Sequence, residues 1–291
     1  MDTLFSRQSE EKNIDRLCAQ KRLYIEAQQV FVLQIILTVP ITILLSLVKT
    51  VVAFLKIDIS AYVLVYGISL TLIDLLVINL VISNLKSNAA KVQELFDCTV
   101  YDLEWNRFCC GKKPTQKTIN KHSRVFKSSG KPITKLRGWY PIELATQSSL
   151  KAIVLCQKTN LSYDTVIRKQ FKSKTLVVSS ITLTILIFFA LIRNFSLKDF
   201  ISQMAFSFLP VFALTAKIII DQNETLKTYE ELRNNIGGLL DDENNISLKE
   251  IRSIQDQLFC IRKDSALIPE FFYDKIRDKL EKEMHHDVAN Y

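Results

Sequence analysis

Residues 30–48 of the chain read VFVLQIILTVPITILLSLV, and this stretch decides the class of fold. It contains no charged residue, and a helix needs about 20 mostly apolar residues to cross the hydrocarbon core of a bilayer. Three further stretches are similarly apolar, and Asp74 and Lys217 are their only charged residues: residues 62–82, 176–192 and 200–220. A buried helix of a soluble protein can resemble one such stretch, but hardly four. We therefore expect four transmembrane helices in two hairpins.

Lysine and arginine are unevenly distributed around these spans. Residues 83–173 hold seventeen of them, residues 1–26 hold five and residues 221–291 hold ten, whereas the link within each hairpin holds two. Cytoplasmic segments of membrane proteins carry the excess of positive charge. Both termini and the central segment are therefore predicted to lie in the cytoplasm. The N-terminal segment lacks the short apolar core of a secretory signal.

The segments between the spans are expected to be helical, because glycine and proline are scarce, with six of each. The cytosolic pieces are short for independent cores, so we expect them to assemble into one α-helical domain. The fold class is thus mainly α. The predicted segments are a cytosolic N-terminal helix (1–29), a first transmembrane hairpin (30–82), a cytosolic helical segment with a basic loop (83–173), a second hairpin (174–220) and a cytosolic C-terminal segment (221–291).

Local signals refine the cytosolic segments. The second and fourth spans are predicted to continue as helices into the segments that follow them. The basic stretch from Lys112 to Arg137 is expected to be an irregular loop, with anionic lipid headgroups as one possible partner. Gly237 and Gly238 predict a break in the last long helix. Ser247, with Glu250 three residues later, forms the pattern of a capping box at the start of a further helix.

Polar residues inside the predicted spans are candidates for function, since they are costly in lipid. Asp74 and Asn79 lie in the second span, Gln34 in the first and Gln203 in the fourth. Either these groups bond neighbouring helices together, or they face a water-filled path. Lys217 lies close to the cytosolic end of the fourth span, so we expect its amine to reach the interface. Pro40 and Pro210 are expected to bend their helices.

No enzymatic signature is present. The chain has no phosphate-binding glycine loop, no GxSxG, no HExxH and no dinucleotide fingerprint. The vicinal Cys109 and Cys110 have no histidine at ligand spacing, and the adjacent His285 and His286 point in different directions on a helix. We predict no catalytic residue, no metal site and no cofactor.

Arginines near aromatic residues are the candidate ligand-binding groups of the cytosolic segments. Arginine forks two hydrogen bonds to a phosphate, and a base stacks on an aromatic face. The same groupings also occur in an ordinary helical core with a solvated rim. The net charge of +8 fits nucleic acid, anionic lipid or a phosphate-rich ligand alike. The candidates are Trp105, Tyr140, Tyr163, Arg168, Arg262 and Tyr273.

Four runs of sequence carry a resemblance to a known family. They are LCAQKRLYIEAQ (17–28), ELFDCTVYDLEWN (94–106), YPIELATQSSLKAIVLCQKTNLSYDTVIRKQF (140–171) and IQDQLFCIRKDSALIPEFFYDKIRDKLEKEM (254–284). In this order, separated by these spans, they resemble the SMODS-associated four-transmembrane effector family of bacterial antiphage (CBASS) systems. The family pattern around Cys156, Gln157 and Asn160 continues here with Tyr163 and Ile167, where tryptophan and leucine are more usual.

The resemblance implies a multi-pass protein of the bacterial inner membrane that answers a cyclic oligonucleotide made by a neighbouring synthase. Such an effector disrupts the membrane, and its expected partners are the cyclic nucleotide, the bilayer and further copies of the chain. Binding of DNA or RNA is not expected. Two alternatives remain open from the residues: a constitutive channel or small transporter, and a membrane scaffold for a protein partner.

Overall fold

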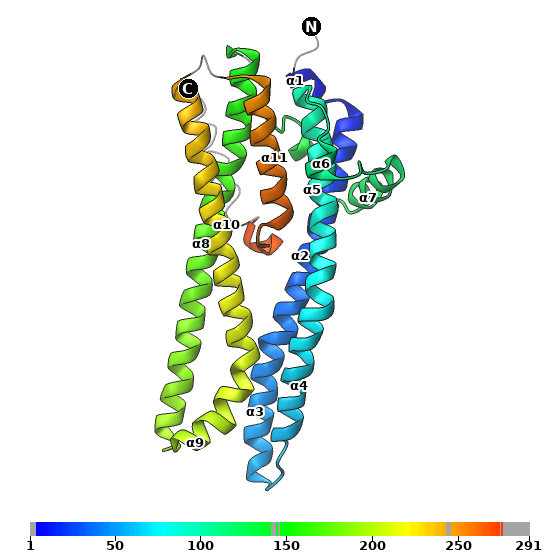
Figure 1. The fold of residues 1–291 in the computed structure, drawn as a ribbon. Helices are drawn as coiled ribbons and strands as arrows, with labels where there is room; N and C mark the ends of the chain where they lie inside the picture. The colour runs from blue at the N-terminus through cyan, green and yellow to red at the C-terminus, as the bar shows by residue number, and fades with distance from the viewer. Residues whose placement is uncertain (1–3, 141–143, 145, 243–245, 274, 276–291) are drawn as a thin grey trace. The chain divides into compact units, whose positions relative to one another are not determined.

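The computed structural model describes residues 4–140, 144, 146–242, 246–273 and 275, and these residues form helices joined by turns and loops, with no strand (Figure 1). This confirms the predicted mainly α class. The helices, in order, are α1 (Leu4–Arg7), α2 (Glu11–Thr38), α3 (Pro40–Phe54), α4 (Ser60–Ile73), a π-helical segment (Asp74–Ile78), α5 (Asn79–Tyr101), α6 (Arg107–Cys110), α7 (Gln116–Ser128), a 3₁₀ turn (Ile133–Leu136), α8 (Ser149–Ile192), α9 (Leu197–Asp199), a second π-helical segment (Phe200–Ala205), α10 (Phe206–Asp241) and α11 (Leu248–Asp264).

The chain divides into two compact units. Unit 1 comprises residues 1–28, 83–168 and 224–291, and unit 2 comprises residues 29–82 and 169–223. Helices α2, α5, α8 and α10 each contribute residues to both units. Helix α5 contains the end of the second predicted span and continues to Tyr101, and α10 contains most of the fourth span and continues to Asp241. This confirms the prediction that both spans continue as helices beyond their apolar stretches.

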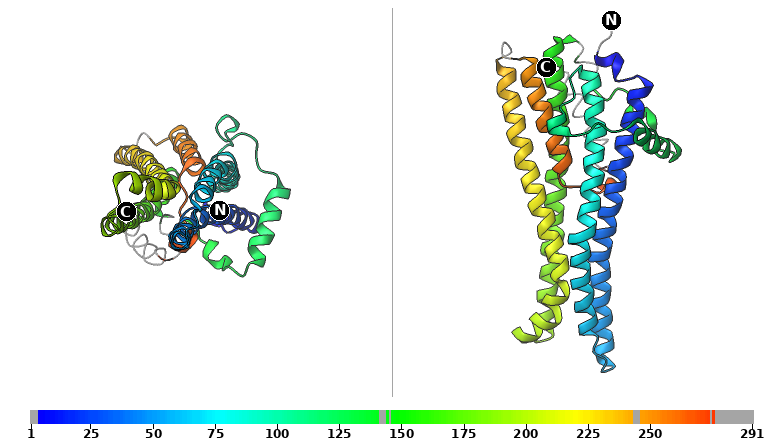
Figure 2. Two further views of the ribbon diagram at one scale, coloured as in Figure 1. Left: turned by 90° about the horizontal axis from the view of Figure 1, so that it is seen from below. Right: turned by 45° about the vertical axis from the view of Figure 1, so that its right-hand side comes forward.

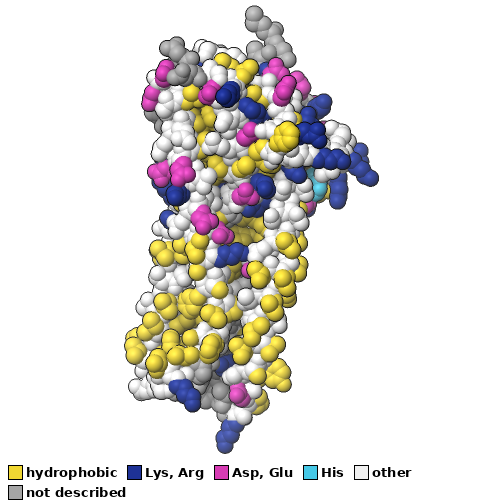
Figure 3. Space-filling model, viewed as in Figure 1, with side chains coloured by type: hydrophobic (Ala, Val, Ile, Leu, Met, Phe, Trp, Pro, Cys, Tyr) yellow, Lys and Arg dark blue, Asp and Glu magenta, His cyan; other side chains and the backbone are white. Residues whose placement is uncertain are grey.

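Unit 2 exposes a large apolar surface, which is unusual for a protein in water. Apolar side chains crowd over its helices, whereas charged side chains lie over unit 1 (Figure 3). Three helical stretches of the described chain are long and apolar enough to cross a membrane: Glu11–Lys49, Ser60–Tyr101 and Ser149–Ile192. The fourth predicted span falls on the π-helical segment Phe200–Ala205 and the first turns of α10.

Two close contacts join the helices of unit 2. The Tyr66 hydroxyl of α4 donates a hydrogen bond to the carbonyl oxygen of Leu37 in α2, at 2.6 Å. A methyl group at Gly67 would lie 3.1 Å from Cγ of Pro210. Glycine therefore allows α4 to approach α10 at the proline, which lies inside α10 without ending it.

The core of unit 1 gathers apolar side chains from segments far apart in the sequence. Leu17 of α2, Val154 of α8, Leu232 of α10 and Leu258 of α11 belong to the same buried cluster. Helix α5 lies beside α2 in this unit (Figure 2). Arg16 of α2 donates from Nη1 to Oγ1 of Thr99 in α5 at 2.6 Å. The core thus depends on all three sequence segments of the unit.

The basic stretch from Lys112 to Arg137 is not an irregular loop, as predicted, because it contains the thirteen-residue helix α7. The Thr115 side chain caps the first turn by accepting from the N–H of Thr118. Ile119 and Phe126, seven residues apart, are both buried. Two turns of helix place them on one face, and their burial stabilises a helix whose remaining residues are mostly polar or basic.

The predicted break at Gly237 and Gly238 is also wrong. Helix α10 runs through both glycines to Asp241. Each glycine costs the helix about 1 kcal/mol relative to alanine. Ile236 is fully buried in the core of unit 1, and Leu239 packs against the same core. Tertiary packing on both sides of the glycines therefore outweighs their low helix propensity.

The predicted capping box at α11 is confirmed. Ser247 is the N-cap, its Oγ accepts from the N–H of Glu250, and the two side chains are hydrogen-bonded to each other. We expect Ser247→Ala to lower the free energy of unfolding by about 1 kcal/mol, because the first turn loses its cap. Unfolding by denaturant, followed by tryptophan emission, measures this loss. Ser253→Ala, at an exposed position inside the same helix, is the control and should be neutral or slightly stabilising.

Candidate functional site

A buried charged network lies in the centre of unit 1. It begins with Glu94 and Asp97, which are three residues apart on α5 and therefore share one helix face. Both carboxylates are fully buried, with an exposed fraction of 0 %. Buried charges are costly unless they are paired and hydrogen-bonded, so the partners of these two groups decide whether the fold tolerates them.

Asp97 is satisfied by three donors from two parts of the chain, Tyr140 and helix α11. The Tyr140 hydroxyl donates to Oδ1 at 2.6 Å, and Arg262 of α11 donates from Nη1 to Oδ2 at 2.5 Å. Gln255 adds a bond to Oδ2 at 3.0 Å. Burial alone lowers the pKa of Arg262, but the Asp97 carboxylate outweighs burial and holds that pKa above its ordinary value. Burial and the same carboxylate raise the pKa of Tyr140. Arg262 is thus a permanent cation and Tyr140 a permanent donor at neutral pH.

Glu94 extends the network to a second arginine. Arg252 donates from Nη2 to Oε1 of Glu94 at 2.7 Å, and Gln255 donates to Oε2 at 2.8 Å. Gln157 of α8 in turn donates to Oε1 of Gln255 at 3.0 Å. Gln255 therefore bridges both carboxylates and connects α5, α8 and α11 through one amide group.

The network has donor and acceptor capacity left over. Among the described residues, Nη2 of Arg262 and Oε1 of Gln157 are buried and have no hydrogen-bond partner. Buried polar atoms are almost always paired, and an unpaired one indicates a water, an ion or a ligand. The two atoms mark where an additional polar group can enter the network.

A second arginine–carboxylate pair lies elsewhere in unit 1. Arg168 of α8 donates from Nε to Oδ2 of Asp164 at 2.8 Å and from Nη1 to the carbonyl oxygen of Ala266 at 2.5 Å. The Tyr229 hydroxyl of α10 donates to the same oxygen of Asp164 at 2.5 Å, and its ring lies 5.2 Å from the guanidinium. This pair joins α8, α10 and the segment after α11.

Unit 2 contains a polar cluster within its apolar helices. Gln34 of α2 donates to Oδ1 of Asp74, and Nζ of Lys217 in α10 lies 3.7 Å from Oδ2 of Asp74. The Lys217 amine also donates to Oδ1 of Asn79 at 2.5 Å. Lys217 therefore does not simply reach the interface, as expected from the sequence. Its amine instead joins two helices, because it contacts the side chains of Asp74 and Asn79 on the neighbouring helix.

The π-helical segment explains how Asp74 and Asn79 both reach Lys217. Five residues of an α-helix turn by about 500°, which would place these side chains about 140° apart. Here the N–H of Asn79 donates to the carbonyl of Asp74, five residues earlier, so one wider turn separates them. The two polar side chains consequently lie on the same side of the helix.

The apolar spans and the charged clusters occur in a chain that matches a known protein family. A family model described as the SMODS-associating 4TM effector domain matches residues 2–291. The chain belongs to this family. The match confirms the resemblance carried by the four sequence runs, and the four spans in the description agree with the predicted fold.

One curated relative of this 4TM effector is named a probable CBASS effector molecule of Bacillus cereus (strain VD146). It is 26% identical over 187 residues, which cover 63% of this chain and 62% of the relative. The chain thus matches less than two thirds of the relative's length. No solved structure matches.

The six candidate ligand residues of the 4TM effector do not form one cluster. Tyr140 and Arg262 meet at Asp97, whereas Arg168 belongs to the Asp164 pair. Trp105 donates from its indole N–H to the carbonyl of Gly111 at 2.9 Å, and the amine of Lys21 lies 5.4 Å from the Tyr273 ring. Tyr163 lies in α8, but its side chain is outside the described residues.

The sequence did not predict several members of the two clusters: Glu94, Asp97, Gln157, Arg252 and Gln255 of the charged network, and Lys217 of the polar cluster. Glu94, Asp97 and Gln255 lie within the runs that carry the family resemblance, but charged residues near a helix end are normally solvated. The available signal was their spacing: Glu94 and Asp97, three residues apart, share a face with the apolar Val100. Lys217 was missed because its position permitted snorkelling.

Proposed function

We propose that this protein is the membrane effector of a bacterial cyclic-oligonucleotide antiphage system. In this proposal a cyclic oligonucleotide made during infection binds unit 1 in the cytoplasm. The bound state favours an assembly of several copies whose spans open a path through the inner membrane. The resulting loss of membrane potential arrests or kills the infected cell. Family membership and the name of the Bacillus cereus relative support the effector role.

One observation in the structure carries the proposal furthest: an ionisable pair, Asp74 and Lys217, lies among helices that are otherwise apolar. Charged residues in membrane spans face a bundle interior or a water-filled cavity, and they mark paths for ions. Gln34 and Asn79 surround the pair with further polar groups. Four spans from one copy enclose little space, so the path is expected to form between copies.

The ligand site is proposed to involve the arginines of unit 1. Arg168 and Arg262 already hold carboxylates, so a phosphate must compete with Asp164 or Asp97 for them. Charge-assisted bonds to phosphate are about as strong as those to carboxylate, which makes such an exchange of partners feasible. Arg262 also has one unpaired donor, Nη2, among the described residues. Tyr140, Tyr163, Trp105 and Tyr273 are the proposed aromatic contacts for bases.

An exchange of partners links binding to conformation. The carboxylate of Asp97 belongs to α5, and that of Asp164 belongs to α8. Both helices also contribute residues to unit 2. A ligand drives a change only if it binds the active state more tightly than the resting state. In this proposal the resting state binds phosphate weakly because Asp97 and Asp164 occupy the arginines, and the active state binds it tightly because these carboxylates have been released.

Ligand-dependent leak from liposomes tests the proposal. We expect protein reconstituted in liposomes to dissipate an imposed potential, read with a potential-sensitive dye, when one member of a panel of cyclic dinucleotides and trinucleotides is added. Linear dinucleotides of the same bases are the control and should have no effect. A protein that leaks equally without ligand is a constitutive channel. A protein that leaks with none of the cyclic nucleotides contradicts the proposal.

A further inference from the structure

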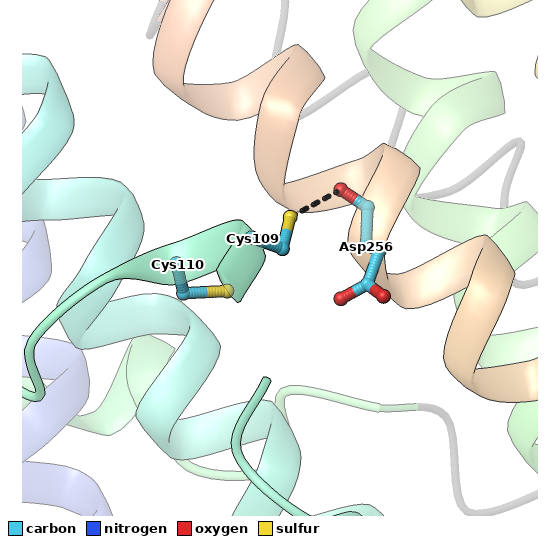
Figure 4. Close-up of side chains that lie close together, drawn as sticks. All are labelled: Cys109, Cys110 and Asp256. Carbon is cyan, nitrogen blue, oxygen red and sulfur yellow. Dashed lines mark hydrogen bonds between the residues drawn. The ribbon is translucent and has the colours of Figure 1, made fainter. Parts of the chain in front are cut away.

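Three thiols and a carboxylate meet in unit 1 at the edge of the charged network, where Arg252 donates both to Glu94 and to Asp256. Cys109 and Cys110 come from α6, and Asp256 and Cys260 come from one face of α11, four residues apart. The ligand atoms of Cys109, Cys110 and Asp256 all lie within 4.8 Å of one another. Sγ of Cys109 lies 3.8 Å from Sγ of Cys260. Figure 4 shows the two vicinal cysteines facing the Asp256 segment across a short gap.

These separations suit a tetrahedral ion. Zinc binds thiolate sulfur at about 2.3 Å, so two sulfurs on one tetrahedral zinc lie about 3.8 Å apart. The Cys109–Cys260 distance already has this value. The ligand atoms of Cys109, Cys110 and Asp256 lie within 4.8 Å of one another, so rotation of these side chains can bring them to a common ion. Cysteine with one carboxylate is also a donor set that favours zinc over magnesium or calcium.

The surrounding residues hold the four groups in place. Asn106 caps α6 by accepting from the N–H groups of Phe108 and Cys109, and its amide donates to Oδ2 of Asp256 at 2.7 Å. Arg252 donates to Oδ1 of Asp256 at 2.7 Å. Each carboxylate oxygen keeps a second lone pair for a metal. Such outer partners orient the ligands of protein metal sites.

The loop that carries the cysteines is closed on itself. The indole of Trp105 donates to the carbonyl of Gly111, on the far side of α6. Gly111 has a φ of +68°, which glycine adopts without strain and which turns the chain back. Cys110 is buried, whereas Cys260 is exposed, so an ion can enter from the Cys260 side.

We propose that Cys109, Cys110, Cys260 and Asp256 bind one thiophilic divalent cation of the zinc class. The ion links the 105–111 loop to α11, the helix that supplies Gln255 and Arg262 to the charged network. Cysteine binds a metal as the thiolate, so binding of the ion releases the thiol protons. This inference does not depend on the proposed effector function.

Metal content and cobalt spectroscopy test the site in the full-length protein. The protein is purified in detergent with reductant, stripped with chelator and loaded with Zn²⁺ or Co²⁺. We expect about one ion per chain by elemental analysis. We also expect the Co²⁺ form to show thiolate charge-transfer absorption and the visible bands of a tetrahedral site. Cys109→Ser and Cys260→Ser should each lower retained metal at least tenfold.

Cys18→Ser is the matched control, because Cys18 is a buried thiol of unit 1 outside the cluster. It should retain the full metal content, and bound Zn²⁺ should protect Cys260 from maleimide in both the unchanged protein and this variant. Stoichiometric metal that survives in Cys109→Ser and Cys260→Ser overturns the proposal. Reduced protein that binds no metal also overturns the proposal. This holds even if Cys109 and Cys260 form a disulfide when the protein is oxidised.

Discussion

Replacing Arg262 by methionine is expected to lower the free energy of unfolding by about 3–5 kcal/mol. Methionine retains most of the side-chain volume, so the loss comes from charge. Asp97 is fully buried, and without Arg262 its carboxylate keeps only the hydrogen bonds of Tyr140 and Gln255. Removing one partner of a buried ion pair leaves an uncompensated charge, which costs more than the pair itself contributes.

Tryptophan emission measures this loss, because both tryptophans of the chain, Trp105 and Trp139, lie in unit 1. Arg124→Met on the exposed side of α7 is the control and should change stability by less than about 0.5 kcal/mol. The double variant Asp97→Asn/Arg262→Met should recover part of the loss, since no lone charge remains. If Arg262→Met unfolds like the unchanged protein but no longer responds to nucleotide, Arg262 serves the ligand and not the core.

Asp74→Asn is expected to raise ion leak in the absence of any nucleotide. The substitution keeps the size and shape of the side chain, but it replaces one acceptor oxygen by an NH2 donor and removes the charge opposite Lys217. Interhelical polar contacts in membranes are worth about 0.6–1.7 kcal/mol. If the resting packing loses this amount, the open population, and with it the basal leak, rises about 3- to 20-fold.

The liposome dye assay without ligand measures this basal leak, at matched protein content. Asp58→Asn is the control, because Asp58 is an exposed aspartate of unit 2 that accepts from the N–H of Ser60 and has no part in the polar cluster. Its leak should equal that of the unchanged protein. Lys217→Met should reproduce the effect of Asp74→Asn. Unchanged basal leak in both variants, with a normal response to nucleotide, would show that the cluster is packing alone.

The apolar spans and the helices that extend them were predictable, since hydropathy and period are local properties of sequence. The cap at Ser247 was predictable for the same reason, because both of its partners lie within four residues. The π-helical turn at Asp74 was not, as nothing in the residue types distinguishes it from an α turn. Helix α7 was missed because only two buried apolar residues, Ile119 and Phe126, offset its basic composition.

The candidate sites were less predictable than the fold. Arg262 and Asp97 are 165 residues apart, and the proposed metal-binding group of Cys109, Cys110, Asp256 and Cys260 joins α6 to α11 across a similar distance along the chain. No spacing rule connects such residues, because the packing of the helices brings them together. The prediction of no metal site examined only local ligand spacing around Cys109 and Cys110. The proximity of Asp256 and Cys260 to these cysteines is a property of the folded chain and is not visible in the local sequence.

The π turn between Asp74 and Asn79 also bears on how relatives of this protein are compared. A π turn is an α turn with one residue added, so a relative without that residue would have its two polar side chains four apart instead of five. In an α-helix, residues four apart share a face, as these two do here. An alignment without a gap would then record the loss of one polar residue. A spacing of four residues in an α-helix and a spacing of five in a π turn therefore place the same two polar side chains on one side of the helix. In both cases they can contact the lysine.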